Sequence, residues 1–292
     1  MSIIHIGGSI LEALHRLQVE PAIARALEED WGYRDWTTDL CVSSARAAKA
    51  KLICKEDTVV SGVEVAEMVF DVVDPNLRIE RLVANGERLQ AGSKILIVSG
   101  SANSILKAER VALNFLGRMC GIASHTAKYV EKIATTKVQL LDTRKTTPGL
   151  RLFEKAATHT GGARNHRFGL SDGIMLKENH IRAAGSISNA MSALHESLPP
   201  TIKVEVETTC INEVEEALQA AADIIMLDNM SFSEMKRAVQ LVDGRAILEA
   251  SGNIQLENVA EVAATGVDFI STSSVITKAR WADLSLLFDI DQ

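Results

Sequence analysis

The sequence predicts an α/β protein with two domains, an N-terminal α+β domain and a larger domain in which helices connect parallel strands. Two observations carry this prediction. After residue 137, six short apolar runs follow one another with helix-like segments between them, which is typical of parallel strands joined by crossover helices. Before residue 101, strand-like stretches are separated by short Gly-containing turns, which predicts an antiparallel sheet. A chain of 292 residues is long enough for a substantial core in each part.

Composition excludes several classes of protein. An apolar content of 47% with 24% charged residues is typical of globular proteins. No apolar run reaches the roughly 18 residues that a membrane span requires, and the N-terminus lacks a basic segment and a cleavage site, so we expect no membrane association and a cytoplasmic location. The four cysteines show no metal-site spacing and suit reduced thiols. A net charge of -7 argues against nucleic acid as a partner.

The first hundred residues alternate between helix and strand patterns. Apolar residues at helical spacing predict a helix over 9–29 and a second over 61–73, which Pro75 ends. Residues 47–55 alternate well enough for a strand. Residues 77–100 contain an Asn-Gly and an Ala-Gly pair, and we expect two or three antiparallel strands there.

A single long apolar-periodic region follows, over residues 103–133. The Cys120-Gly121 pair is a candidate interruption of this helix. Glu109 and Arg110 lie on it, and by residue type alone they are interpreted as part of an exposed helical stripe.

The six apolar runs of the second half are VQLLD, GIMLK, KVEVE, IIMLD, AILEAS and FIS. They fit either a closed α/β barrel or an open doubly wound sheet. A barrel brings all strand ends to one mouth, whereas an open sheet concentrates functional residues at one switch point. Nearly every run here ends in a side chain capable of chemistry, which favours the barrel, and no dinucleotide-binding or P-loop motif occurs. These end residues are Asp142, Lys177, Glu207, Asp228, Glu249 with Ser251, and Ser271.

Residues 142–180 form a basic island in an acidic chain. From Arg144 to Arg182 there are eight Lys or Arg residues against three acidic residues, a local charge of +5. Because Arg grips anions at two points and the Gly161-Gly162 pair lets backbone N–H groups approach them, the island predicts a pocket for a small, multiply anionic ligand. The simpler alternative is a solvated charged loop.

The predicted mouth would have two halves of opposite charge. The carboxylates suit Mg²⁺ or sugar hydroxyls, and the late polar segments 251–253 and 271–274 suit a phosphate, although a cap or a turn is as common a use of such residues. Two enzymatic interpretations stay open at this level: Lys177 as the Schiff-base lysine of an aldolase-like barrel, or several cations that together bind a pyrophosphate and carboxylates. A third, non-enzymatic interpretation is an anion-sensing or scaffold protein on an inactive barrel. The two halves are Arg144, Lys145, His166, Arg167 and Lys177 on one side, and Glu207 and Asp228 on the other.

Eight segments, in order along most of the chain, resemble the quinolinate phosphoribosyltransferase family, also called nicotinate-nucleotide pyrophosphorylases (carboxylating). They are EDWGYRDWTTDL, ERVALNFLGRMCGIA, DTRKTTPGLR, GGARNHRFGLSDGIMLKENHI, KVEVET, IIMLDNM, LEASGNI and GVDFIS. The resemblance implies an N-terminal α/β sandwich domain over 1–112, against which the tail 280–292 could pack, and an incomplete α/β barrel of six or seven strands over 113–279. It also implies a homodimer whose active sites are each bordered by the partner's N-terminal domain, and it leaves a higher oligomer open.

The implied reaction joins quinolinate to 5-phosphoribosyl-1-pyrophosphate with Mg²⁺ and no organic cofactor, and gives nicotinate mononucleotide, pyrophosphate and CO₂. The resemblance implies that the quinolinate carboxylates are bound by Arg144, His166, Arg167 and Arg110, the last from the partner subunit. Catalytic roles fall to Lys145, Lys177, Glu207 and Asp228. Of these, the lysines would contact the phosphoribosyl donor or substrate, and the carboxylates would hold ribose hydroxyls and the metal, directly or through water.

The remaining substrate contacts would come from Thr143, from Ser251, Gly252 and Asn253, and from Ser271, Thr272 and Ser273, the last two groups around the 5-phosphate. The chain departs from the family at 271–276, STSSVI, where the family has a glycine followed by a threonine. A barrel family linked to molybdenum transport operons shares part of the pattern and is the nearest alternative function.

Overall fold

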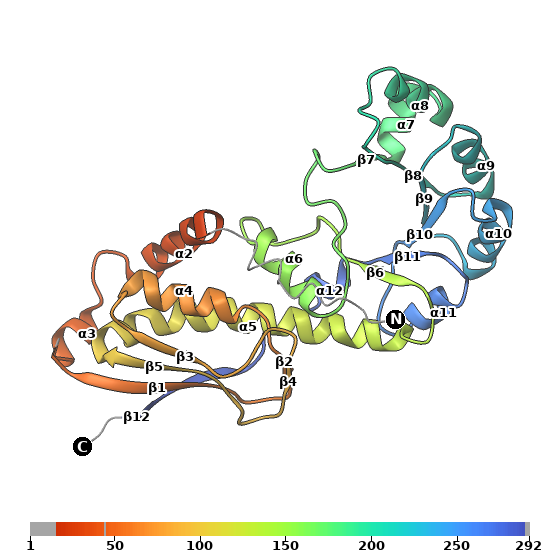
Figure 1. Ribbon diagram of the computed structural model, residues 1–292. Coiled ribbons are helices and arrows are strands. Elements are labelled where there is room, and N and C mark those ends of the chain that lie inside the picture. The colour runs from red at the N-terminus through yellow and green to blue at the C-terminus, as the bar shows by residue number, and fades with distance from the viewer. Residues whose placement is uncertain (1–15, 44, 290–292) are drawn as a thin grey trace. The chain divides into compact units, whose positions relative to one another are not determined.

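The computed structural model describes residues 16–43 and 45–289 and divides into two compact units (Figure 1). The first comprises the described residues up to Ala127 together with 147–161 and those from Ala279 onward. The second comprises 128–146 and 162–278. The boundary expected between residues 112 and 113 stays a prediction, and both residues lie within one helix, α5 (Ala102–Ile133).

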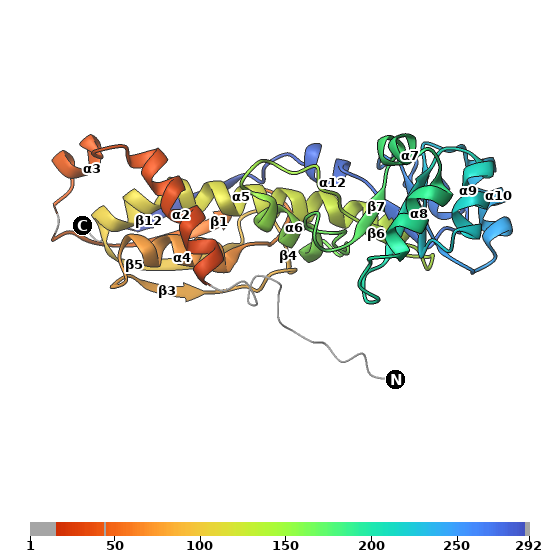
Figure 2. The same cartoon turned by 90° about the horizontal axis from the view of Figure 1, so that it is seen from above.

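The first unit is built on a four-stranded antiparallel sheet in the order β12-β1-β5-β3. Figures 1 and 2 show α4 and α5 covering one face of this sheet. The predicted strands and the helix over 61–73 are confirmed. The predicted helix over 9–29 is confirmed from Arg16 onward, and its first residues lie outside the described part. The elements are α2 (Arg16–Trp31), α3 (Trp36–Cys41), β1 (Ala47–Cys54), β2 (Thr58–Val59), α4 (Val63–Val73), β3 (Arg78–Arg81), β4 (Arg88–Leu89), β5 (Lys94–Ser101), α5, α6 (Arg151–Thr160) and β12 (Leu284–Asp289).

The last described strand returns to this first sheet. β12 pairs antiparallel with β1, with Leu52 opposite Leu286. In β1 every second residue from Ala48 to Cys54 is buried, so the strand presents one apolar face to the core as its alternation predicts.

α5 runs without the interruption that the Cys120-Gly121 pair suggested. Glycine is needed at position 121 because another segment of the chain passes close to the helix. A Cβ at Gly121 would overlap the carbonyl of Arg280, and Ala282 donates its N–H to the Gly117 carbonyl at 2.9 Å. Gly121 therefore makes room for a crossing chain segment and does not end the helix.

A buried ion pair ties α6 to α5 within the first unit. Glu154 is 0% exposed and accepts hydrogen bonds from Arg118 Nε at 2.9 Å and Nη2 at 2.7 Å. The same carboxylate accepts the backbone N–H and the hydroxyl of Thr147, both at 2.8 Å. Four hydrogen bonds to one buried carboxylate compensate its loss of hydration.

Six parallel strands form the sheet of the second unit, each at one of the predicted apolar runs. Helices α8, α9 and α10 lie outside the arc of strands in Figure 1. The elements are β6 (Gln139–Leu141), β7 (Ile174–Leu176), α7 (Glu178–Ala184), α8 (Ile187–His195), β8 (Val204–Thr208), α9 (Ile211–Gln219), β9 (Ile224–Asp228), α10 (Phe232–Val242), β10 (Ile247–Ser251), α11 (Val259–Ala263), β11 (Phe269–Ser271) and α12 (Ser274–Thr277).

The strand order shows an incomplete barrel. It reads β6-β11-β10-β9-β8-β7, so each strand from β7 to β10 pairs with the next along the chain, and β6 pairs with β11. This is the circular order of a barrel opened between β6 and β7, whereas a doubly wound sheet reverses its order at a switch point. All six carboxyl ends therefore face one mouth. Among the described residues, no helix combines the length and apolarity needed to cross a membrane.

Candidate active site

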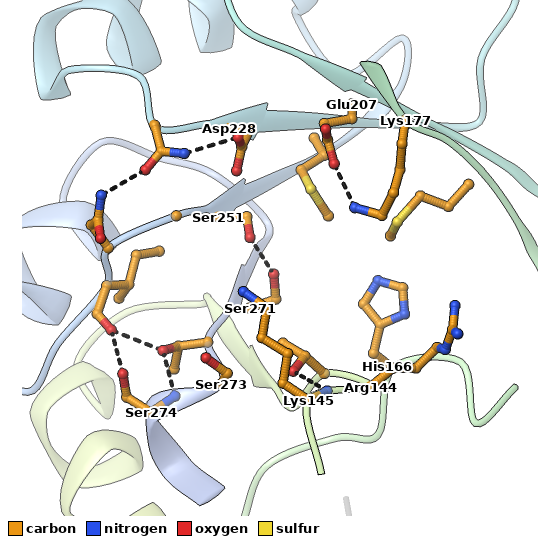
Figure 3. A pocket seen from close by; sticks show the side chains of 18 of the residues that line it. Arg144, Lys145, His166, Lys177, Glu207, Asp228, Ser251, Ser271, Ser273 and Ser274 are labelled. Carbon is orange, nitrogen blue, oxygen red and sulfur yellow. Dashed lines mark hydrogen bonds and ion pairs between the residues drawn. The ribbon is translucent and has the colours of Figure 1, made fainter. Parts of the chain in front are cut away.

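A cavity of about 560 Å³ lies at the carboxyl ends of the barrel strands (Figure 3). This volume is in the range of small-molecule sites. Every predicted site residue in the second unit lines it: Thr143, Arg144, Lys145, His166, Arg167, Lys177, Glu207, Asp228, Ser251, Gly252, Asn253, Ser271, Thr272 and Ser273. Arg110 is exposed on α5 in the first unit and is not one of the lining residues.

The surroundings of Arg167 favour the binding of an anion. Its Nε is buried without a hydrogen-bond partner among the described residues. Burial lowers the pKa of Arg167, and the charge of Arg144 lowers it further. A carboxylate bound between the two guanidinium groups would relieve both effects, because it supplies an acceptor and an opposite charge.

His166 is held at both ring nitrogens. Its Nδ1 accepts the backbone N–H of Arg167 at 2.7 Å, which assigns the ring proton to Nε2. Nε2 lies 3.2 Å from a carboxylate oxygen of Glu205 and 3.6 Å from one of Glu249. A substrate carboxylate would therefore compete with two buried glutamates for this proton.

Glu205 was missed as a site residue in the sequence. The alternation V-E-V-E could have identified it, because strand residues two apart share a face and Glu207 was already assigned to the mouth. Glu249 and Ser251 share a face of β10 in the same way. Glu205 and Glu249 are 4% and 1% exposed.

The two glutamates and His166 form a cluster of close polar side chains. Burial, followed by the charge of Glu205, raises the pKa of Glu249 to about 7. The ligand atoms of the three side chains lie within 4.8 Å of one another. With the proton on Nε2, however, His166 has no lone pair on that nitrogen for a metal ion.

Lys177 and Glu207 form an ion pair across the cavity wall, with Nζ and Oε2 2.6 Å apart (Figure 3). The lysine side chain is 48% exposed. A Schiff-base lysine needs an apolar surround that favours the neutral amine. A half-exposed ammonium paired with a carboxylate lacks that surround, so the geometry does not support the aldolase interpretation.

Glu207 and Asp228 stand at the ends of neighbouring strands, β8 and β9, and both line the cavity. Asp228 Oδ2 accepts one hydrogen bond from the Asn229 amide at 2.9 Å. Two partly exposed carboxylates that face a ligand cavity are the hard oxygen donors that Mg²⁺ prefers. The donor set fits this ion.

The two late loops are joined by hydroxyl contacts. Ser271 Oγ donates to Ser251 Oγ at 3.1 Å, while the Thr272 and Ser274 hydroxyls donate to the Ile254 carbonyl at 2.8 and 3.2 Å. Thr272 and Ser274 therefore use their hydroxyl protons to hold the loop. Ser273 also lines the cavity, in the segment that departs from the family pattern.

Gly252 is required by its surroundings as well as by its backbone. Its φ is +89°, and an added Cβ would overlap the side-chain amide of Asn229. A close-packed loop with left-handed backbone exposes N–H groups, which suits an anion.

Family comparisons match both units. Residues 35–120 match the quinolinate phosphoribosyl transferase N-terminal domain, and residues 122–287 match the C-terminal domain of the same family.

Relatives and solved structures agree with the family models. The chain is 42% identical over 271 residues to a probable nicotinate-nucleotide pyrophosphorylase [carboxylating] of Synechocystis sp., which covers 92% of each chain. It is 40% identical to the chloroplastic enzyme of Arabidopsis thaliana, over 94% of this chain and 83% of the relative. The nicotinate-nucleotide pyrophosphorylase structure from Francisella tularensis superposes with a TM-score of 0.91 at 38% identity, over 94% of this chain and 98% of that one. This chain belongs to the quinolinate phosphoribosyltransferase family.

Proposed function

We propose that this protein transfers the phosphoribosyl group of 5-phosphoribosyl-1-pyrophosphate to quinolinate with decarboxylation, and so makes nicotinate mononucleotide, pyrophosphate and CO₂. Relatives at 40–42% identity are named for this reaction. Those names favour it over both the molybdenum-operon and the aldolase alternatives.

The observation that carries the proposal is the division of one cavity by charge. Arg144, Lys145 and Arg167 form one wall, and Glu207 and Asp228 form another. A dicarboxylate and a pyrophosphorylated sugar repel each other in water. A wall of cations next to a wall of carboxylates lets both bind in contact, which lowers the entropic and electrostatic cost of their encounter.

The charged side chains of the cavity orient the substrates and stabilise the charges that develop during the reaction. The guanidinium groups of Arg144 and Arg167 orient the pyridine ring through its carboxylates, so that the ring nitrogen faces the anomeric carbon. As the bond from that carbon to pyrophosphate breaks and positive charge develops on the sugar, the carboxylates of Glu207 and Asp228 stabilise it. Lys145 and Lys177 neutralise the leaving phosphates.

No organic cofactor is needed for the decarboxylation. After the new bond forms, the ring nitrogen is cationic and stabilises the electron pair left on the adjacent ring carbon when CO₂ departs, and that carbon then takes a proton from water. Glu207 and Asp228 are the proposed holders of Mg²⁺, directly or through water, and the ion would supply charge neutralisation to the departing pyrophosphate.

We also propose a homodimer in which the exposed Arg110 of one subunit completes the quinolinate site of the other, with a higher oligomer left open. A cytoplasmic location belongs to the same proposal. Neither nucleic acid nor a membrane is an expected partner.

The activity is tested with purified protein, Mg²⁺ and both substrates. Mass spectrometry should show nicotinate mononucleotide from quinolinate and little product when nicotinate replaces it, because nicotinate lacks the second carboxylate. The proposal is wrong if no nucleotide forms, or if nicotinate is used equally well.

A further inference from the structure

The open seam of the barrel is covered on one side by a loop segment. β6 and β7 are the two edges of the sheet. Arg164 donates its N–H to the Leu140 carbonyl at 2.8 Å, and Asp142 donates its own to the Arg164 carbonyl at 3.2 Å. The segment 164–167 therefore begins as a short parallel extension of the sheet beside β6.

The side chain of Asp142 continues this attachment beyond the backbone pairing. It is fully buried, accepts the His166 backbone N–H at 2.9 Å on one oxygen, and accepts the Asn165 side-chain amide at 2.7 Å on the other. Both bonds have a charged acceptor, which makes them stronger than neutral ones.

The same segment is tied to the other edge of the seam by Arg167. Its Nη1 donates to the carbonyl of Gly173 at 2.9 Å, and Gly173 directly precedes β7. Segment 164–167 thus bridges the seam, with Asp142 as its anchor on the β6 side.

Asp142 also stands directly before Thr143, Arg144 and Lys145 in the chain. The buried carboxylate of Asp142 thus fixes two positions. One is the start of the loop that carries Arg144, and the other is the backbone of His166, which directly precedes Arg167. The distance between these two guanidinium groups decides whether they can grip the two carboxylates of a rigid ring together. A change of about 1 Å in such a geometry can cost around a hundredfold in rate.

We infer that Asp142 is a positioning residue which, through Asn165 and the His166 backbone, sets the spacing of Arg144 and Arg167 and thereby the selectivity for a dicarboxylate. This inference rests on the proposed function. It assigns Asp142 no contact with substrate.

The exchange Asp142→Asn with Asn165→Asp tests the inference. In Asp142→Asn alone, the new side chain offers one acceptor oxygen to two donors. If this oxygen accepts the His166 N–H, its NH₂ group faces the NH₂ group of Asn165; if the amide is turned round, the His166 N–H loses its acceptor. In the double variant, the amide oxygen introduced at position 142 accepts from the His166 N–H, and its NH₂ group donates to the carboxylate introduced at position 165. Both hydrogen bonds are then restored, the second with donor and acceptor reversed.

We expect Asp142→Asn to lower kcat/KM for quinolinate about 10- to 100-fold. The KM for 5-phosphoribosyl-1-pyrophosphate should rise less than the KM for quinolinate, because most of the proposed donor contacts lie on the strand ends and loops from β7 to β11, and Lys145 is the exception on the loop that Asp142 begins. The double variant should recover most of the lost kcat/KM. Asn165→Ala, which keeps the bond to His166, should show a smaller loss and serves as the second variant if Asp142→Asn does not fold.

Asp223→Asn is the matched control. Asp223 also accepts a backbone N–H, that of Val204 at 2.8 Å, but it precedes β9 at the opposite end of the barrel. It should lose stability without a selective rise in the quinolinate KM.

The outcomes separate the two ideas. An inactive wild type refutes the proposed function. An active wild type whose double variant is no better than the worse single variant, or whose variants impair both substrates equally, refutes the role of Asp142.

Discussion

Replacing Glu249 by Gln should stabilise the protein at neutral pH. Glu249 is 1% exposed on β10, and burial together with the Glu205 charge raises its pKa to about 7 from an ordinary 4.5. At pH values between 4.5 and about 7, Glu249 keeps its proton in the folded protein and loses it in the unfolded chain. Because the folded state binds more protons, stability falls as pH rises through this window and is constant above it.

The size of the effect follows from the two pKa values. Each pH unit between them is worth 1.36 kcal/mol, so the ionised Glu249 costs at most about 3 kcal/mol at pH 8. Gln resembles the protonated acid in shape and, like it, carries no charge. Glu249→Gln should therefore gain up to about 3 kcal/mol at pH 8 and less than about 1 kcal/mol at pH 5.

Urea unfolding followed by circular dichroism at pH 5, 6, 7 and 8, without ligands, measures this difference. Glu261→Gln on the exposed side of α11 is the control and should stay within about 0.5 kcal/mol of wild type at every pH. A stability difference for Glu249→Gln that does not grow between pH 5 and pH 8 would refute the reasoning.

Four further outcomes are expected. Lys177→Ala should lower kcat/KM at least about 100-fold, and borohydride treatment of the wild type with carbonyl compounds should leave no adduct on Lys177; a clean adduct there would revive the aldolase mechanism. Glu207→Gln should raise the Mg²⁺ concentration for half-maximal activity at least about tenfold, and an unchanged Mg²⁺ titration would argue against this ligand. Arg110→Ala and Lys145→Ala, each inactive, should regain about a quarter of wild-type activity when mixed and allowed to exchange subunits, since one site in each mixed dimer is intact; no recovery despite verified exchange would contradict shared sites. Arg118→Ala should cost about 3–5 kcal/mol in unfolding free energy because it leaves a buried carboxylate unpaired, and a loss below about 1 kcal/mol would show that water reaches this pair.

The strands of the barrel were predictable because two signals coincide at each of them. A short apolar run marks the strand, and a polar residue such as Lys177 or Asp228 marks its end at the mouth. The mouth residues at strand ends, such as Lys177, Glu207 and Asp228, were found for the same reason, because the carboxyl ends of parallel strands meet at one edge of the sheet whatever the loops between them are.

Other features depended on contacts that no local pattern contains. Gly121 resembles a helix break in the sequence, and only the chain at 280–282, about 160 residues later, reveals it as a packing contact. His166 lies in a loop without periodicity, so its engagement by Glu205 and Glu249 could not be anticipated. Arg110 lies in the other unit, and its predicted role rests on the family resemblance alone.

The return of β12 to the first sheet has a consequence for biosynthesis. β1 is the second strand of that sheet, and its outer neighbour is β12, which is formed by residues 284–289. While a ribosome is still making the barrel, β1 of the nascent chain is an unprotected edge that can pair with another chain. The first sheet is thus completed only after the barrel has been synthesised, and until then the edge of β1 is a site at which the chain can aggregate.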